Sequence, residues 1–253
     1  MNKPLEGKHA LVTGGGSGIG AATAGLLSNY GCQVTVLGRT PERLQEALFD
    51  VEDGHAAVAD VTKSDELEAA LAGARERFGR IDILVNNAGI AKGGPFVKTE
   101  DAVWRDIFEV NLFSIVNLTR LLLPSMLEAE WGRVVNVASI AGLRGSPYTT
   151  AYTASKHALV GLTRSLSMET TKKNVTVNAV CPGYVDTPMT NRTVENIQMQ
   201  TGRSEEESRG ELEKMSAIGR LITPDECAST IAWLCLDEQA AVTGACIPLG
   251  GGV

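Results

Sequence analysis

The sequence predicts an α/β protein built on a doubly wound parallel sheet of about seven strands, with helices on both faces. Short runs rich in β-branched residues alternate with longer stretches of helical periodicity, which is the pattern of repeated strand, helix and strand units. The 253 residues are 43% hydrophobic, enough apolar surface for one continuous core. Neither a linker nor an internal repeat interrupts the pattern. We therefore expect a single domain over residues 1–253.

The first half of the chain supplies four strands, each bounded by turn residues or by a helix. Residues 18–30 carry small and apolar side chains at helical spacing, Pro41 opens the next helix, and residues 64–78 form a charged amphipathic helix. Each of these helices fits a crossover between parallel strands. The strands themselves cover residues 9–13, 33–37, 56–59 and 83–85.

The second half continues the alternation with longer helices. Residues 101–129 form one helical stretch, in which Pro124 should produce a kink or a break because proline removes a backbone donor. A further long helix is expected at 150–172. The three remaining strands cover residues 133–137, 175–180 and 245–248.

Residues 188–215 differ in character, being polar, rich in Glu and Arg, and poor in aliphatic side chains. One interpretation is a solvated helical excursion. The other is a mobile substrate lid, since functional loops of such sheets follow the strand ends. The sequence leaves both interpretations open.

Charge and composition favour a small-molecule partner. The 23 basic and 30 acidic residues give a net charge of −7, and no run of Lys or Arg could follow a phosphate backbone, so nucleic acid is not expected as a partner. The amino terminus lacks an apolar signal-peptide core, and no segment approaches the ~18 apolar residues of a membrane span. We expect a cytoplasmic protein without membrane contact.

A metal site is not expected either. The five cysteines form no C-x-x-C pair, and His9, His55 and His157 are far apart in the chain. The cysteines are interpreted as buried apolar side chains.

A glycine cluster, TGGGSGIG at residues 13–20, lies between the first strand and the first helix. Gly14, Gly18 and Gly20 would let the backbone approach a pyrophosphate at the helix amino terminus, with Ser17 and Ile19 beside it. This arrangement indicates a Rossmann-type dinucleotide site. Glycine clusters also form plain tight turns, and the spacing is not the more common G-x-G-x-x-G.

The end of the second strand bears on which dinucleotide binds. An acidic residue there would hydrogen-bond the ribose 2′-hydroxyl of NAD, but this chain has Gly38 and Arg39 instead. The planar guanidinium of an arginine suits a 2′-phosphate, so NADP(H) is favoured over NAD(H). The alternative is that Arg39 is only a solvated charge at the end of the strand. After the third strand, Asp60, followed by Val61, can accept a hydrogen bond from the adenine amino group or cap the following turn.

Two further segments point to chemistry at the strand ends. The NNAG segment, with Asn87, Ala88 and Gly89, follows the fourth strand where a cofactor would cross the sheet, although a plain turn has the same composition. Tyr152 and Lys156 stand four residues apart and share one helical face, so an ammonium can lie beside a phenol. A nearby positive charge stabilises the phenolate and lowers the pKa of the tyrosine, which makes proton transfer near neutral pH feasible.

In their order along the whole chain, these segments resemble the short-chain dehydrogenase/reductase family. The motifs that carry the resemblance are TGGGSGIG at 13–20, ADV at 59–61, NNAG at 86–89, EVNL at 109–112, NVAS at 136–139, YTASK at 152–156 and PGYVDTP at 182–188. Many NADP-using members have a basic residue where this glycine loop has Ser17, so the resemblance leaves Arg39 as the one phosphate contact.

The resemblance also implies a role for each candidate catalytic residue. Tyr152 would exchange the proton with the substrate oxygen, and Ser139 would polarise and orient that oxygen. Lys156 would hold the cofactor ribose and tune Tyr152, and Asn111 would support a water relay. The residues that would flank the nicotinamide are Gly183, Val185 and Thr187.

Two longer stretches, NAVCPGYVDTPM at 178–189 and IGRLITPDECASTIAWL at 218–234, are similar to those of 3-oxoacyl and polyketide ketoreductases. The activity implied is NAD(P)-dependent reduction of a β-keto thioester or a related ketone. NAD-dependent oxidation of a hydroxy compound, as in 3-hydroxybutyrate dehydrogenases, is the alternative, and a noncatalytic dinucleotide-binding protein is a third. The family expectation for assembly is a homotetramer, with the long helices around Asn111 and Tyr152 packed against symmetry mates.

Overall fold

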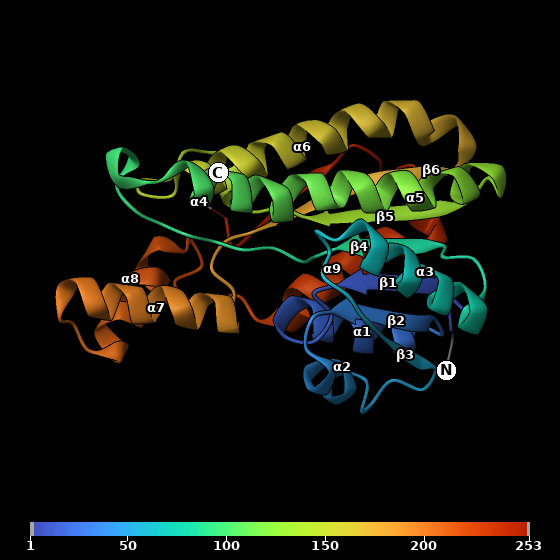
Figure 1. Cartoon of the computed structure of the whole chain (residues 1–253), viewed down its shortest axis with the longest axis horizontal. Coiled ribbons are helices and arrows are strands. Elements are labelled where there is room, and N and C mark those ends of the chain that lie inside the picture. Colours follow the sequence, from blue (N-terminus) through green and yellow to red (C-terminus); the bar gives the residue numbers. More distant parts are fainter. Residues whose placement is uncertain (1–2, 252–253) are drawn as a thin grey trace.

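The computed structural model describes residues 3–251 and contains a parallel sheet of seven strands, in the spatial order β3-β2-β1-β4-β5-β6-β7 (Figure 1). The chain builds outward from β1 on one side and from β4 on the other, so the strand order reverses between them. This confirms the predicted doubly wound sheet. The strands are β1 (His9–Thr13), β2 (Gln33–Gly38), β3 (Gly54–Val58), β4 (Ile83–Asn86), β5 (Gly132–Val137), β6 (Val175–Pro182) and β7 (Cys246–Leu249).

Helices cover both faces of the sheet (Figure 1). On one face lie α1, α9 and, near the edge, the short α2; on the other lie α3, α5 and α6. The sequence did not predict α9, which follows the stretch expected to be a lid. The bounds are α1 (Gly18–Asn29), α2 (Pro41–Ala47), α3 (Ser64–Phe78), α5 (Ser114–Glu128), α6 (Thr150–Thr170) and α9 (Pro224–Cys235).

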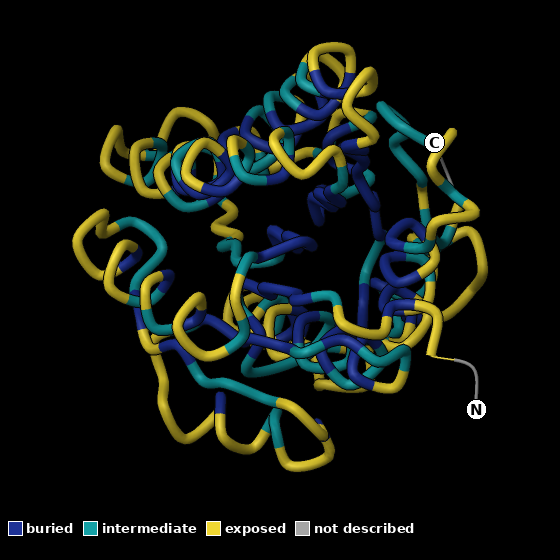
Figure 2. Tube along the Cα trace, turned by 90° about the vertical axis from the view of Figure 1, so that its right-hand side faces the viewer, coloured by how far each residue is buried: buried dark blue, intermediate teal, exposed yellow. Residues whose placement is uncertain are grey.

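The two faces have separate apolar clusters because side chains alternate along each strand. Val12 of β1 packs with Leu27 of α1, whereas its neighbour Leu11 packs with Leu67 of α3. In Figure 2, the buried segments lie at the centre of the molecule and the exposed segments on the outside. Four of the five cysteines are buried, and within residues 3–251 all five are free thiols, in agreement with their predicted role as apolar side chains.

The helical stretch expected at 101–129 is irregular, but not at the proline. Helix α4 (Asp101–Phe108) passes through a π-helical turn (Glu109–Phe113) into α5, and α5 continues through Pro124. A break at Pro124 is therefore wrong and a kink there stays a prediction; the interruption of the helix lies at the turn that carries Asn111. Such π turns occur frequently at functional sites.

The same stretch, Asp101–Glu128, is long and apolar enough by composition to cross a membrane, since an 18-residue window within it has a mean hydropathy of 1.4. This corrects the expectation that no segment approaches such a span. One side of the stretch packs on the sheet, where Leu118 and Leu122 are fully buried against Leu84 of β4. That packing accounts for part of its apolar character, since 39% of the apolar window is buried.

Residues 188–215 form two helices, α7 (Pro188–Thr201) and α8 (Glu205–Met215), which project from one end of the molecule (Figure 1). They share a small apolar cluster of Val194, Leu212 and Leu221. The helical part of the first interpretation, a solvated helical excursion, agrees with the structure. Its function as a substrate lid stays a prediction.

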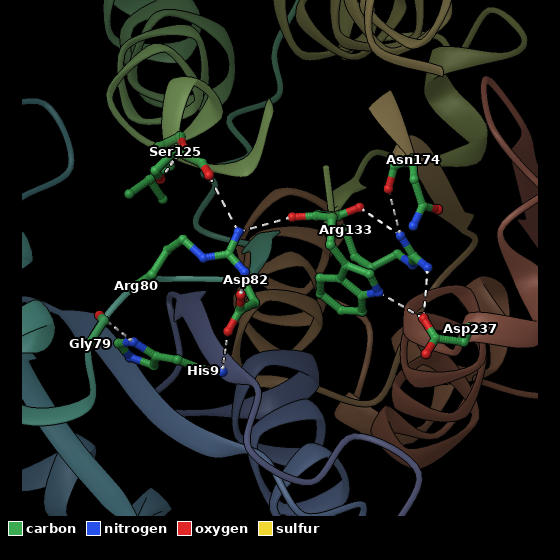
Figure 3. A network of polar contacts seen from close by, with 11 residues as sticks. His9, Gly79, Arg80, Asp82, Ser125, Arg133, Asn174 and Asp237 are labelled. Carbon is green, nitrogen blue, oxygen red and sulfur yellow. Dashed lines mark hydrogen bonds and ion pairs between the residues drawn. The ribbon is translucent and has the colours of Figure 1, made fainter. Parts of the chain in front are cut away.

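The sheet edge at the strand amino ends carries two ion pairs, each with one buried partner (Figure 3). Arg80 contacts Asp82 at 2.5 Å, and Asp82 also accepts a hydrogen bond from the backbone N–H of His9. The fully buried Arg133 pairs with Asp237 at 3.1 Å. The Asp82 bond joins the starts of β1 and β4, and Arg80 also donates to the carbonyl oxygen of Trp131 just before β5. The pair of Arg133 and Asp237 joins the start of β5 to the segment after α9.

Candidate active site

A cavity of about 660 Å³ lies along the carboxyl ends of the strands. Its volume is typical of small-molecule and cofactor sites, and this edge is where doubly wound sheets bind ligands. Gly18, Gly20 and Asn111 do not line it but support its walls. The predicted residues that line it are Gly14, Ser17, Ile19, Arg39, Asp60, Val61, Asn87, Ala88, Gly89, Ser139, Tyr152, Lys156, Gly183, Val185 and Thr187.

The glycine loop turns sharply from β1 into α1. Gly14 and Gly18 have φ values of 61° and 53°, a region that glycine adopts without strain. A Cβ added at Gly20 would collide with the carbonyl oxygen of Gly14, so the helix can approach the loop only with glycine there. Ser17 at the N-cap makes no side-chain capping bond, which leaves the first N–H groups of α1 open to an anion. The loop therefore fits a dinucleotide pyrophosphate.

Thr13 is a supporting residue that the sequence did not reveal. Its hydroxyl accepts hydrogen bonds from the backbone N–H groups of Asn87 and Ala88, each at 3.0 Å. The Asn87 side chain donates in return to the carbonyl oxygens of Thr13 at 2.9 Å and Gly14 at 3.2 Å. These bonds join the glycine loop and the NNAG segment into one wall. Nothing in the sequence indicates a partner for Thr13 that is 74 residues away.

The adenosine end of the cavity carries two arginines. Arg39 is largely exposed, and one of its guanidinium nitrogens lies 3.9 Å from Oδ2 of Asp60. Asp60 accepts hydrogen bonds from the backbone N–H and hydroxyl of Thr62, which is the turn-capping interpretation, and it also lines the cavity. Burial acts to raise the pKa of Asp60, but the Thr62 bonds and the Arg39 charge hold it below its usual value. Arg43 of α2, absent from the predicted set, lines the cavity beside Gly16.

The proton-transfer end is built from α6 and the residues after β5. The Ser139 hydroxyl accepts a hydrogen bond from the backbone N–H of Ala141 at 3.1 Å and is within hydrogen-bonding reach of the Tyr152 phenol. Burial raises the pKa of Tyr152, and the bond with Ser139 acts in the opposite direction. Because both residues line the cavity, one substrate oxygen can contact both hydroxyls.

Lys156 lies one helical turn after Tyr152 and is only 4% exposed. Its ammonium donates to the carbonyl oxygen of Val137 at 2.8 Å and is 5.7 Å from the centre of the Tyr152 ring. Burial lowers the pKa of Lys156 to about 8, with Cys181 acting in the opposite direction. The predicted lowering of the Tyr152 pKa by this ammonium is not found in this structure, where burial raises that pKa and the hydrogen bond with Ser139 is what acts to lower it.

Asn111 is fully buried in the π-helical turn, and its amide is satisfied by protein groups. The side-chain oxygen accepts from the N–H of Ile90 at 2.9 Å, and the nitrogen donates to the Ile90 carbonyl at 2.9 Å and to Ser155 Oγ at 3.1 Å. Ser155 donates to the carbonyl oxygen of Tyr152 at 2.7 Å. Asn111 thus connects the loop after β4 to the turn that bears Tyr152. Its implied water relay stays a prediction.

Known proteins resemble the chain over almost its full length. The family model described as short chain dehydrogenase matches residues 8–198. The 3-oxoacyl-[acyl-carrier-protein] reductase of Vibrio cholerae is 37% identical over 251 residues, and the D-beta-hydroxybutyrate dehydrogenase of Cupriavidus necator is 38% identical over 255. Each alignment covers 98% of both chains.

A solved structure is also similar to this chain over its full length. A variant of actinorhodin polyketide ketoreductase, crystallised with NADPH, has a TM-score of 0.94 and 37% identity, and the match covers 100% of this chain and 98% of the other. The resemblance drawn from the sequence motifs is therefore confirmed. The chain belongs to the short-chain dehydrogenase family.

Proposed function

We propose that this protein reduces a ketone to a secondary alcohol with NADPH, and that the substrate is a β-keto thioester or a related ketone. The observation that carries the proposal is that Ser139, Tyr152 and Lys156 line the same cavity as the glycine loop. Relatives named 3-oxoacyl-[acyl-carrier-protein] reductase and polyketide ketoreductase support the substrate class.

The bound nicotinamide would supply the hydride, for which the protein has no side chain of its own. The hydroxyls of Ser139 and Tyr152 would hold and polarise the substrate carbonyl oxygen, and Tyr152 would then give that oxygen its proton. The raised pKa of Tyr152 suits reduction, because the phenol keeps its proton until the oxygen becomes basic. Lys156 would hold the ribose hydroxyls beside Gly89, where a larger side chain would crowd Asn111 and the ammonium.

A second candidate is NAD-dependent oxidation of a hydroxy compound, favoured by the 38% identity with D-beta-hydroxybutyrate dehydrogenase. Reduced-nicotinamide absorbance during turnover separates the candidates. We expect the fastest turnover with NADPH and acetoacetyl-coenzyme A or another β-keto thioester. Faster turnover of 3-hydroxybutyrate with NAD⁺ would favour the second candidate. Cofactor binding without turnover of any ketone or alcohol would leave a noncatalytic binding protein.

The charges at the adenosine end support the preference for NADPH. Gly38 carries no carboxylate that would repel a 2′-phosphate, and both Arg39 and Arg43 line the cavity. Arg43 would supply the second basic group that the glycine loop lacks at Ser17. An arginine contact to phosphate contributes about 1.5 to 3 kcal/mol, less where solvent screens it. We therefore expect kcat/KM to favour NADPH over NADH by about tenfold or more.

The test of this preference is Gly38→Asp, which should shift it toward NADH. Gly38→Ala is the matched control, since in both variants the new Cβ would lie 3.3 Å from Cδ2 of Leu44 and only one adds a charge. The alanine variant should keep the wild-type preference. A wild-type protein that favours NADH would contradict the assignment of Arg39 and Arg43 and would support the oxidative candidate.

We expect kcat/KM for NADPH to fall as the pH rises above about 8, where Lys156 loses its proton, because burial lowers its pKa to about 8. The pH profile of kcat/KM reports groups of the free enzyme. Tyr152, whose pKa is raised, keeps its proton over this range. Lys156→Arg stays charged, so its profile should lack this fall. An identical fall in both proteins would assign it to another group.

We also propose a cytoplasmic homotetramer, formed by a single domain whose α7–α8 segment, residues 188–215, covers the substrate. No nucleic acid or membrane is proposed as a partner. Exposed apolar side chains on α5 and α6, including Leu121 and Met168, support the assembly, because symmetric pairing of these helices would cover them. A monomeric mass by light scattering would contradict the tetramer.

A further inference from the structure

The segment from α7 to the start of α9 carries four arginines, and three of them have acidic partners. Arg209 contacts Asp186 at 2.5 Å, Arg220 contacts Glu226 at 2.6 Å, and Arg203 lies 3.8 Å from Glu211. The fourth is Arg192, which takes part in none of the ion pairs found within residues 3–251. It is also the one of the four that lines the cavity.

The position of Arg192 follows from the way α7 meets the glycine loop. Thr187 begins the helix, and a Cβ added at Gly18 would lie 2.9 Å from its Cγ2 atom, so the two segments are in close contact. Pro188, Met189 and Arg192 share one helical face, and all three line the cavity. Val194 lies on the opposite side of the helix and is buried in the apolar cluster with Leu212 and Leu221. The first turns of α7 thus direct a guanidinium toward the space in front of α1.

A cation at this place would strengthen the binding of a dinucleotide. A pyrophosphate carries two negative charges, and the loop TGGGSGIG contributes backbone N–H groups but no basic side chain. Arg39 and Arg43 are assigned above to the 2′-phosphate, although the backbone and Cβ of Arg43 lie beside Gly16 of the loop. Arginine is the side chain best suited to two neighbouring phosphate oxygens, because its planar fork donates two parallel hydrogen bonds.

We propose that Arg192 contacts the pyrophosphate of the bound dinucleotide and thereby holds α7 over the cofactor. The inference rests on the proposed dinucleotide-dependent function, and it makes Arg192 a positioning residue for the cofactor. An anionic group on the substrate is the other anion that could reach Arg192. If Arg192 contacts the pyrophosphate, its loss weakens nucleotide binding even without substrate. If it contacts a substrate anion, its loss weakens substrate binding alone.

The first experiment measures the Kd for NADPH by nucleotide fluorescence, with no substrate present. We expect Arg192→Met to raise this Kd about tenfold and Arg192→Lys, which keeps a point charge, to raise it less. Arg203→Met is the matched control, because it removes one positive charge from the same segment at a residue outside the cavity. Its Kd should equal that of the wild type.

Two nucleotide fragments then locate the contact. Arg192→Met should weaken 2′-phospho-ADP-ribose, which has the pyrophosphate, and leave 2′-AMP unchanged, whereas Arg39→Ala should weaken both. An unchanged Kd for NADPH in Arg192→Met, with a raised KM for the ketone alone, would overturn the proposal in favour of a substrate contact. Equal weakening of both fragments by Arg192→Met would also overturn it. A wild-type protein that binds neither NADPH nor NADH would instead reject the proposed function itself.

Discussion

Tyr152→Phe is expected to lower kcat by about three orders of magnitude, within the range that a positioned proton donor contributes. The change removes the phenolic oxygen that faces the cavity together with Ser139 and keeps the ring packing. The Kd for NADPH should therefore stay within about twofold of the wild-type value. Single-turnover kinetics with a β-keto thioester and a fluorescence titration with NADPH measure the two quantities on the same preparation.

The matched control for this variant is Tyr30→Phe. Tyr30 is a partly buried tyrosine that packs against the core at the end of α1, away from the cavity. It should turn over at the wild-type rate, which excludes a general effect of removing a phenolic oxygen. If Tyr152→Phe retained most of the activity, the substrate oxygen would have to receive its proton from another group.

Lys156→Met is expected to damage both binding and chemistry. The methionine keeps most of the buried stem and removes the ammonium that donates to Val137 and lies 5.7 Å from the Tyr152 ring centre. We expect the Kd for NADPH to rise about tenfold, because one charge-assisted contact to the ribose is lost. We also expect kcat to fall about 100-fold, because the charge beside Tyr152 is lost at the same time.

The control for loss of a lysine is Lys173→Met. Lys173 is exposed, pairs with Glu130 and does not line the cavity, so its loss should change neither constant. A Lys156→Met variant with lowered kcat and wild-type Kd would show that the ammonium does not hold the nucleotide. The reverse result would show that it holds the nucleotide without assisting Tyr152.

Much of the fold was predictable because it depends on local patterns. The strands have runs of β-branched residues with helices between them, and β1 lies at residues 9–13 as expected. Helix α9 was missed, although its start carries a signal: Thr223 and Glu226 form a capping box, a T-x-x-E pattern that the sequence displays. Ser204 and Glu207 form the same motif at the start of α8.

The residues of the site were predictable where a motif carries them, and not where the fold brings distant groups together. Tyr152 and Lys156 are one turn apart, so their relation follows from helix geometry alone. Arg43 lies in no motif and reaches the cavity only because α2 packs against Gly16. The raised pKa of Tyr152 could not be predicted either, since it results first from burial, which depends on the complete structure.

The π-helical turn at Glu109–Phe113 has a consequence for the phase of the whole helical stretch. One buried stripe runs from Ile107 through Asn111, Ile115, Leu118 and Leu122 to Met126, in five steps of one turn each. Five turns of a regular α-helix take about 18 residues, whereas this stripe takes 19. The π turn absorbs the extra residue, so α4 and α5 both keep their apolar sides inward while a polar amide occupies the junction. In an uninterrupted α-helix of the same sequence, the stripe would wind away from the sheet by about 100° beyond Asn111.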